Sequence, residues 1–371
     1  MKIGVIAGEK SGDNYGALLI EWIRKFEPDI FVIGTGGEGI RQKADLFIEC
    51  PYGKMGFSGV ITRLPLFYHS FQKVKEILEK ENPAFIVFID NPGFNLKLAG
   101  ALGKKIPCFY YIPPKVWAHN YNRIRIIKRY IKAVITIFPF EQDIYKKENI
   151  PSFWFGHPVI DLIVDGPEER QEKEDIPVIG LLPGSREEEI KYLLPVFIYT
   201  VNLLSKQRKV RVLLSASDRR IKDIEEKILK RHNTEIEIIE GNPYNLIKKS
   251  ALVLAGSGTV NLEVCLYRKP LLVFYKTSYF NYIIARLMVK LDMISPLNLI
   301  LGEKVVPEYI QHFSYRAILD DIKDLLDKGI LYKKQMDEFA RLYGMMDGGS
   351  VSEKVAMFLL RGFQKDDKRD I

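Results

Sequence analysis

Residues Lys2 to Gly16 read KIGVIAGEKSGDNYG, an apolar run followed by a glycine at every fourth position. An apolar run of this length predicts a buried strand, and the glycines predict a loop that leads into a helix. The pattern matches neither Gly-x-Gly-x-x-Gly nor the Walker motif, which disfavours a dinucleotide site or a P-loop. The stretch therefore predicts the strand, loop and helix that begin an α/β domain.

The same alternation continues along the chain. Further strand-like runs lie at Phe31–Gly34, Ala84–Ile89, Cys108–Ile112, Ala133–Ile137, Val178–Leu182, Val210–Ser215, Glu235–Ile239, Ala251–Ala255 and Leu271–Phe274. Helical patterns separate these runs, and one of them, Leu66–Glu81, has an apolar face made of Phe67, Phe71, Val74 and Leu78. Apolar strands that alternate with helices predict parallel sheets covered on both faces.

The chain has 371 residues, and roughly 100–200 residues per domain suggests two domains. A charged stretch from Val164 to Pro177 has no apolar face and predicts a linker. We therefore expect an α/β fold of two doubly wound, Rossmann-like domains that face a cleft. The expected bounds are 1–164 and 165–344, followed by a C-terminal helix and tail at 345–371 that can cross back to the first domain. Ligands of such sheets bind beyond the carboxyl ends of the strands.

The composition indicates which kinds of binding partner the protein can have. Hydrophobic residues make up 47% and charged residues 27%, as in ordinary globular proteins. The net charge of +8 favours nucleic acid, a phosphorylated ligand or an anionic membrane, without choosing among them, and also suits a basic soluble enzyme. Cys50, Cys108 and Cys265 are far apart, so neither a zinc site nor a disulfide framework is indicated. No apolar run approaches the ~20 residues that span a bilayer, and no signal-peptide cleavage region is recognisable at the start.

In the first half, polar and acidic residues at two strand ends are candidates for a functional site. Asp90 ends an apolar strand, at the edge of the sheet where α/β sites form, although an Asp before Asn91-Pro92-Gly93 also suits a turn. Ser11 and Asp13 can cap the first helix. Glu9 precedes that helix and is harder to explain as a cap.

The second half contains two similar loops after strands. Gly184-Ser185-Arg186 and Ser257-Gly258-Thr259 both lead into helices, where backbone N–H groups and a guanidinium suit a diphosphate. The acidic residues after Arg186 also suit the first turn of any helix. Glu263 follows one turn later, within reach of ribose hydroxyls. The chain contains no Asp-x-Asp, so we expect neither a metal nor a cofactor.

A basic amphipathic pattern runs from Asn122 to Lys132. Helical spacing places one set of residues on a basic face and another on an apolar face: Arg125, Arg129 and Lys132, and Ile124, Ile127 and Ile131. The basic face is either ordinary solvated surface or a site for anionic lipid. The aromatic stretch from Tyr279 to Lys290 is expected to belong mainly to the core.

The ordered set of motifs resembles lipid-A-disaccharide synthases, inverting glycosyltransferases of the two-domain GT-B architecture. The resemblance spans Met1 to Gln311 and rests on Gly8–Ala17, Asp90-Asn91-Pro92, Phe94-Asn95, Pro114–Ala118, Pro139-Phe140-Glu141, Gly156-His157-Pro158, Leu182–Arg186, Ser257-Gly258-Thr259, Leu262-Glu263, Pro296-Leu297-Asn298, Pro307-Glu308 and Gln311. It implies that UDP-2,3-diacylglucosamine is joined to 2,3-diacylglucosamine 1-phosphate (lipid X) through a β-1,6 linkage, with release of UDP.

The resemblance also implies roles for individual residues. Asp90 matches the proposed general base, and Glu9 joins it as a catalytic candidate beside the first-loop residues Gly8, Ser11, Gly12 and Asp13. The positions associated with the UDP-sugar are Gly184, Ser185, Arg186, Ser257, Gly258, Thr259, Glu263, Asn298, Glu308 and Gln311. We expect a cytoplasmic protein held peripherally at the inner membrane, no nucleic-acid partner, and a homodimer as an option through exchanged C-terminal regions.

The sequence departs from the family pattern at three places. Phe57-Ser58-Gly59 stands where the family carries a Glu, Gly93 replaces a second Asp, and His119 replaces an aromatic residue. Two alternatives therefore stay open. One is another UDP-sugar enzyme of this architecture, an epimerase or a peptidoglycan-type glycosyltransferase, and the other is a non-catalytic lipid-binding homologue.

Overall fold

The computed structural model describes residues 1–8, 10–50, 64–117, 120–162, 176–288, 293–346 and 350–366. It divides into two compact units, Met1–Leu162 with Gly348–Ile371, and Ile163–Asp347. Several residues singled out above lie outside the described residues: Glu9, Phe57-Ser58-Gly59, His119 and the predicted linker up to Asp175.

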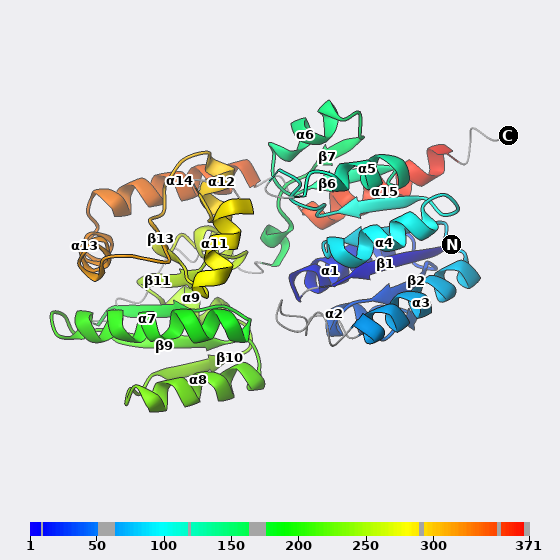
Figure 1. Cartoon of the computed structure of the whole chain (residues 1–371). Helices are drawn as coiled ribbons and strands as arrows, with labels where there is room; N and C mark the ends of the chain where they lie inside the picture. The colour runs from blue at the N-terminus through cyan, green and yellow to red at the C-terminus, as the bar shows by residue number, and fades with distance from the viewer. Residues whose placement is uncertain are drawn as a thin grey trace. The chain divides into compact units, whose positions relative to one another are not determined.

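The first unit is built on a parallel sheet (Figure 1). Its strands are β1 (Lys2–Ala7), β2 (Phe31–Thr35), β3 (Leu46–Phe47), β4 (Phe85–Ile89), β5 (Cys108–Tyr111), β6 (Ala133–Thr136) and β7 (Ser152–Trp154). Their order across the sheet is β3-β2-β1-β4-β5-β6-β7. The apolar runs predicted β1, β2, β4, β5 and β6, whereas β3 and β7, with two and three residues, are too short for a run to mark them.

Helices cover both faces of this sheet. They are α1 (Lys10–Phe26), α2 (Glu38–Arg41), α3 (Leu64–Glu81), α4 (Pro92–Leu102), α5 (Arg123–Tyr130), α6 (Glu141–Lys147), the 3₁₀ helix η2 (Pro158–Leu162) and α15 (Val351–Asp366). Helices α3, α4 and α5 bury their apolar faces in one core with the strands, and the predicted face of α3 contributes Phe67, Phe71, Val74 and Leu78. Burying such side chains contributes roughly 1.5–3 kcal/mol each.

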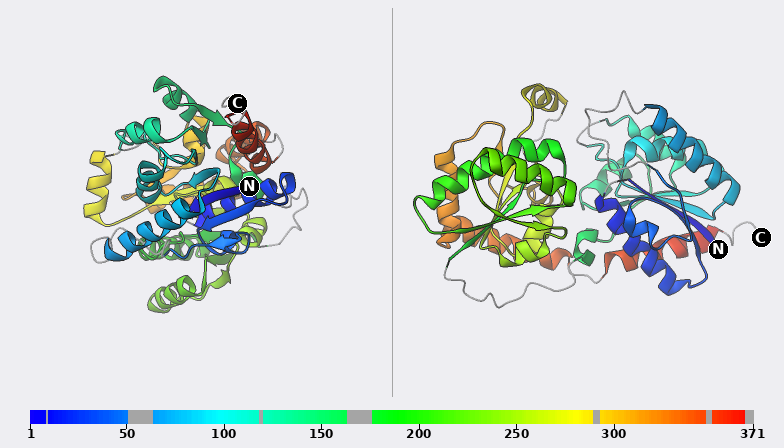
Figure 2. Two further views of the ribbon diagram at one scale, coloured as in Figure 1. Left: turned by 90° about the vertical axis from the view of Figure 1, so that its right-hand side faces the viewer. Right: turned by 90° about the horizontal axis from the view of Figure 1, so that it is seen from below.

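The C-terminal helix α15 packs against α1, as Figure 2 shows in red and blue. The carboxylate of Asp161 in η2 caps the first turn of α15. It accepts hydrogen bonds from the N–H groups of Val351 at 3.0 Å and Ser352 at 2.6 Å. A carboxylate at a helix N-terminus satisfies otherwise orphaned donors and favours the helix dipole. The last helix of the chain is therefore part of the first unit.

The predicted basic helix forms, but it is shorter than expected. Ile124 and Ile127 are buried in α5, while Arg125 and Arg129 are exposed. The expectation that Lys132 shares the helical face was wrong. Ile131 is already extended, and the N–H of Lys132 donates to the carbonyl of Cys108 at the start of β5, beside which the next strand, β6, begins.

The second unit has a similar parallel sheet (Figure 1). Its strands are β8 (Val178–Leu182), β9 (Arg211–Ala216), β10 (Glu237–Glu240), β11 (Leu252–Gly256), β12 (Leu271–Tyr275) and β13 (Glu308–Ile310), in the order β10-β9-β8-β11-β12-β13. Its helices are α7 (Glu187–Ser205), α8 (Arg219–Arg231), α9 (Tyr244–Lys249), α10 (Val260–Leu266), α11 (Tyr279–Met288), α12 (Pro296–Leu301), α13 (Tyr315–Leu326) and α14 (Ile330–Met346). Helices α7, α8 and α13 share one core with the sheet.

One expectation for this unit was wrong. Tyr279, Phe280 and Ile283 in α11 are 64%, 73% and 43% exposed, so this face of the helix is not core. Cys108 and Cys265 are buried, as predicted. Within the described part of the chain, no helix is long and apolar enough to cross a membrane.

The strand order creates a topological switch point in each unit. In the first, β1 pairs with β4 so that Ala7 lies opposite Ile89, and in the second, β8 pairs with β11 so that Leu182 lies opposite Ala255. Chain connections leave these neighbouring strands in opposite directions across the sheet, which opens a crevice at their carboxyl ends. The loops singled out from the sequence begin at these two points.

Candidate functional site

In the first unit, the loops after β1 and β4 touch. A Cβ atom on Gly8 would lie 2.3 Å from the side-chain nitrogen of Asn91, far inside van der Waals contact. Glycine is therefore required at position 8 by the neighbouring loop. This contact places Gly8 next to the segment that carries Asp90.

Asp90 has an unusual backbone. Its φ is 49° and that of Asn91 is 45°, a left-handed conformation that L-residues adopt rarely, Asp and Asn more readily than the rest. Its carbonyl oxygen accepts hydrogen bonds from the Tyr110 hydroxyl and from the Asn95 amide nitrogen, both at 2.7 Å. Strain that persists under such constraint is typical of functional sites. The side chain of Asp90 is partly exposed at the carboxyl edge of the sheet.

Asp13 has a different position from the one expected of a cap on the first helix. Its carboxylate accepts hydrogen bonds from the N–H groups of Gly37, Gly39 and Ile40 at 2.8, 2.9 and 2.9 Å. It thus holds the loop after β2 and the start of α2. Ser11 and Gly12 lie in the first turn of α1, with Ser11 partly exposed.

A cluster of aromatic and ionisable side chains follows β5, β6 and β7. The buried carboxyl of Glu141 accepts hydrogen bonds from the indole nitrogen of Trp117 at 2.9 Å and from the N–H of Phe138 at 3.3 Å. Burial raises the pKa of Glu141 to about 7. Burial, and then the charge of Lys115, lowers the pKa of His157 to about 3, so this histidine is neutral at physiological pH.

In the second unit, Gly184 and Arg186 form the turn after β8. Gly184 has a φ of 131°, and a Cβ there would lie 2.2 Å from a carboxylate oxygen of Glu189. That carboxylate accepts hydrogen bonds from the Arg186 N–H and from its guanidinium, both at 3.4 Å. An acidic group thus lies against the turn and guanidinium that were predicted to hold an anion. Ser185 and the Arg186 side chain are exposed.

The loop after β11 lies beside this turn. A Cβ on Gly256 would lie 3.0 Å from the carbonyl oxygen of Pro183. The hydroxyl of Ser257 donates to the carbonyl of Ile294 at 2.8 Å, and the N–H of Gly258 donates to the side chain of Asn261 at 2.8 Å. Thr259 stands at the N-cap position of α10 without a capping bond from its side chain, and Glu263 lies partly exposed in the first turn of that helix.

Three other predicted ligand positions make internal contacts. The buried amide of Asn298 donates to Glu308 at 2.8 Å and to Val306 at 2.9 Å, and its oxygen accepts two backbone N–H groups. Glu308 also accepts the N–H groups of Ile294 and Ser295 at 2.9 and 2.8 Å. These contacts join α12, β13 and, through Ser257, the loop after β11.

Gln311 acts similarly on the loop after β12. Its side chain donates to the carbonyl of Thr277 at 3.0 Å and accepts the Thr277 N–H at 3.1 Å. The sequence did not predict that Gln311 would bond to the backbone of a loop. It also did not predict that Asn95, Tyr110 and Asn261 would make such bonds. A buried Asn within an apolar stretch is the signal that could have found Asn95 and Asn261.

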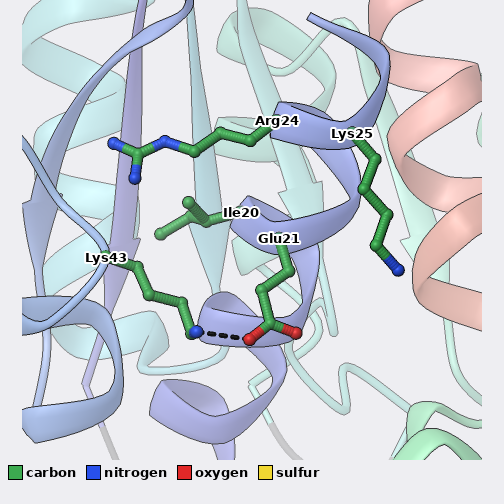
Figure 3. Close-up of a pocket in the computed structure, with 5 residues that line it drawn as sticks. All are labelled: Ile20, Glu21, Arg24, Lys25 and Lys43. Carbon is green, nitrogen blue, oxygen red and sulfur yellow. Dashed lines mark hydrogen bonds and ion pairs between the residues drawn. The ribbon is translucent and has the colours of Figure 1, made fainter. Parts of the chain in front are cut away.

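A surface pocket of about 300 Å³ lies elsewhere on the first unit (Figure 3). It is lined by Ile20, Glu21, Arg24, Lys25 and Lys43. Glu21 pairs with Lys43, and Arg24 pairs with Asp45 at 2.8 Å. Because these residues of α1 lie in its second half, the pocket is distant from the carboxyl edge where the helix begins. Among the described residues, no group of three or more His, Cys, Asp or Glu could hold a metal ion.

Comparisons with known proteins agree with this arrangement. Residues 3–351 match the family model described as lipid-A-disaccharide synthetase. The chain is 31% identical over 369 residues to the lipid-A-disaccharide synthase of Coxiella burnetii (strain Dugway 5J108-111), covering 95% of this chain and 96% of the relative. It is 30% identical over 376 residues to the enzyme of Syntrophus aciditrophicus (strain SB), covering 98% of both.

Solved structures share the fold at low identity. The UDP-GlcNAc 2-epimerase of Neisseria meningitidis has a TM-score of 0.68 and 16% identity, covering 97% of this chain and 100% of that one. The corresponding enzyme of Methanocaldococcus jannaschii has a TM-score of 0.66. These matches confirm the predicted GT-B-like pair of parallel-sheet domains. The family model and the full-length relatives go further: this chain belongs to the lipid-A-disaccharide synthases, the glycosyltransferases of lipid A biosynthesis.

Proposed function

We propose that the protein transfers the diacylglucosamine unit of UDP-2,3-diacylglucosamine to the 6-hydroxyl of 2,3-diacylglucosamine 1-phosphate. The observation that most supports this reaction is the position of Asp90. It stands at the switch point of the first sheet, on a backbone that Tyr110 and Asn95 hold in a left-handed conformation. A carboxylate held in this way suits a base that must meet one hydroxyl group.

The transfer inverts the configuration in one displacement. The acceptor oxygen attacks the anomeric carbon of the donor, and the bond from that carbon to the diphosphate breaks with its electrons on the leaving UDP. The hydroxyl proton passes to the Asp90 carboxylate. A positioned base of this kind contributes about 10²–10⁴-fold to the rate.

The second unit is proposed to bind UDP at the loops after β8 and β11. The guanidinium of Arg186, with the backbone of Gly184, Ser185, Gly258 and Thr259, takes the diphosphate, and Glu263 takes the ribose. Arg186 then exchanges the Glu189 carboxylate for the diphosphate, which its exposed side chain permits. Donors aimed at the leaving group stabilise the charge that develops there.

Asn298, Glu308 and Gln311 are proposed to act indirectly. Their polar atoms hold backbone N–H and carbonyl groups of the α12, β13 and Thr277 segments. They therefore shape the UDP site by fixing its loops. In the first unit Asp13 is proposed to act likewise on the loop at Gly37. Gly8 and Gly12 lie against Asn91 and Ile89, on either side of Asp90 in the chain, and Ser11 is proposed to complete this wall.

We further propose peripheral attachment to an anionic membrane. Arg125 and Arg129 are exposed on α5, and Lys132 is exposed just beyond it. The exposed Tyr279, Phe280 and Ile283 of α11 suit contact with acyl chains, since aromatic residues favour the membrane interface. From the family resemblance we also propose a cytoplasmic location, the inner membrane as the surface, and a homodimer.

Product analysis tests the proposed reaction. Purified protein is mixed with UDP-2,3-diacylglucosamine and the monosaccharide lipid, and the products are separated and identified by mass spectrometry. We expect the disaccharide 1-phosphate and UDP in equal amounts. An epimerised UDP-sugar without disaccharide would instead support an epimerase, and UDP-sugar binding without any product would support a non-catalytic homologue.

A further inference from the structure

Charged and aromatic side chains follow β5, the strand next to the one that ends just before Asp90. Since β5 neighbours β4, the segment after β5 begins next to Asp90, whose N–H donates to the carbonyl of Tyr111 at 3.1 Å. That segment carries Lys115, which is exposed, and Trp117, which is partly exposed. The segment that carries these two side chains therefore begins at the same carboxyl edge of the sheet as Asp90.

The aromatic part of the surface is tightly organised. The ring of Trp117 lies edge-on to that of Phe140, with centroids 5.2 Å apart, and Phe140 stacks on Phe138 at 5.7 Å. Phe140 is partly exposed, whereas Phe138 is buried beneath it. The buried Glu141 fixes the indole through its nitrogen. These contacts hold the indole in one orientation without a ligand, and such preorganisation lowers the entropic cost of binding.

The charged part of the surface is Lys115. Its ammonium lies 5.6 Å from the centroid of Phe138, a cation–π distance. No ion pair to Lys115 is found among the described residues. The nearby Glu141 carboxyl directs both oxygens to N–H donors, and the nearby His157 is neutral. The ammonium is thus the cation that this surface offers to a ligand.

We propose that Lys115, Trp117 and Phe140 form the binding site for the phosphorylated sugar of the acceptor, with Lys115 on the phosphate and the aromatic rings against the sugar. A lysine ammonium binds phosphate as a point charge, and exposed aromatic rings offer apolar area at low entropic cost. This inference rests on the proposed function, whose acceptor carries a phosphate on a sugar ring. Glu141 serves as a positioning residue for Trp117.

The test measures binding of glucosamine 1-phosphate, a soluble probe, to the full-length protein by calorimetry. Saturating UDP is present so that the anion site of the second unit is already filled. Lys115→Met is compared with Lys104→Met, an exposed lysine before β5 at the opposite edge of the sheet. We expect Lys115→Met to raise the Kd at least about tenfold, as for loss of a hydrogen bond to a charged group, and Lys104→Met to leave it unchanged.

Two further arms separate the roles of the charge and the rings. Trp117→Phe is expected to weaken glucosamine 1-phosphate several-fold but leave inorganic phosphate binding unchanged, and Lys115→Arg is expected to restore most of the affinity. The proposal is overturned if the wild-type protein does not bind the probe, if Lys115→Met binds like wild type, or if phosphate alone binds as tightly as the sugar phosphate. Because binding is measured without turnover, a protein that binds the probe through Lys115 but makes no disaccharide would refute only the proposed reaction.

Discussion

The side-chain amide of Asn95 donates a hydrogen bond of 2.7 Å to the backbone carbonyl of Asp90, five residues earlier. The same nitrogen lies 3.2 Å from the carbonyl of Ile89 and 3.4 Å from that of Ile6. One buried side chain thus connects the ends of β1 and β4. A left-handed residue at the end of a strand needs such support, because its conformation is intrinsically unfavourable.

Replacing Asn95 by Leu should therefore lower both stability and turnover. The variant keeps a similar volume but leaves buried carbonyl groups without their donor, at a cost of about 1–3 kcal/mol in the free energy of unfolding. Tyr110→Phe, which removes the second donor to Asp90, is expected to have a smaller effect because Asn95 remains. Urea denaturation and kcat measure the two consequences, and an Asn95→Leu variant with wild-type values of both would show that the bond is dispensable.

Asp90→Asn should lower kcat by about 10²–10⁴-fold with KM values nearly unchanged, because the amide keeps the size of the side chain and removes its basicity. The matched control is Asp143→Asn, an exposed carboxylate in α6 that should leave turnover intact. Initial rates measured over a range of concentrations of both lipid substrates give kcat and KM for each variant. Near-normal turnover by the Asp90→Asn variant would show that Asp90 is not the general base.

Arg186→Ala should weaken UDP binding by about 1.5–3 kcal/mol, the range for a hydrogen bond to a charged group. Arg231→Ala changes an exposed arginine at the end of α8 and serves as the control. Calorimetry with UDP is carried out with and without EDTA, and we expect the chelator to have no effect. Binding that EDTA abolishes and magnesium restores would contradict the metal-free site.

Replacing Arg125, Arg129 and Lys132 together by Gln should release the protein from anionic vesicles. Each basic residue near such a surface contributes about 1 kcal/mol, and the attraction should weaken with salt because exposed charges are screened within about 10 Å. The control removes three exposed lysines of the second unit, Lys206, Lys209 and Lys230. If vesicle sedimentation is the same for both triple variants, total charge rather than this surface holds the protein.

Glu225 should make the second unit less stable as the pH rises. Its carboxyl is fully buried in α8, neither oxygen has a hydrogen-bond partner within the described residues, and burial raises its pKa to about 8 from 4.5. Below pH 4.5 both folded and unfolded states are protonated. Between there and about pH 8 only the unfolded state ionises, so stability is lost across this window and the loss is constant above it.

Glu225→Gln should remove this loss, because an amide does not titrate. The difference in the free energy of unfolding between variant and wild type should grow from pH 5 to pH 8 and then level off. The exposed neighbour Glu226 provides the matched control, Glu226→Gln, for which no such trend is expected. A difference independent of pH would mean that the Glu225 carboxyl ionises normally in the folded state.

The pattern of apolar residues along the chain was enough to predict the central strands of both units. The apolar runs predicted β1, β4, β8 and β11, because a strand covered on both faces must be apolar along its whole length. The short strands β3, β7 and β13 escaped prediction because two or three residues carry no period. Lys132 was misplaced for a related reason. Helical spacing in the sequence continues past the residue at which the helix ends, and the end is set by β6, which begins at Ala133.

The sequence by itself determined where strands end in glycine or acidic residues, and hence where Asp90 and Gly184 stand relative to their strands. Only the tertiary structure decided which of these ends lie together and what their neighbours do. Asp13 and Gln311 read as ligands of a substrate, yet their side chains hold backbone groups 24 and 34 residues away. The physical reason is that side-chain periodicity is a property of neighbouring residues. Hydrogen-bond partners so far apart in the chain are chosen by how the sheets pair and pack.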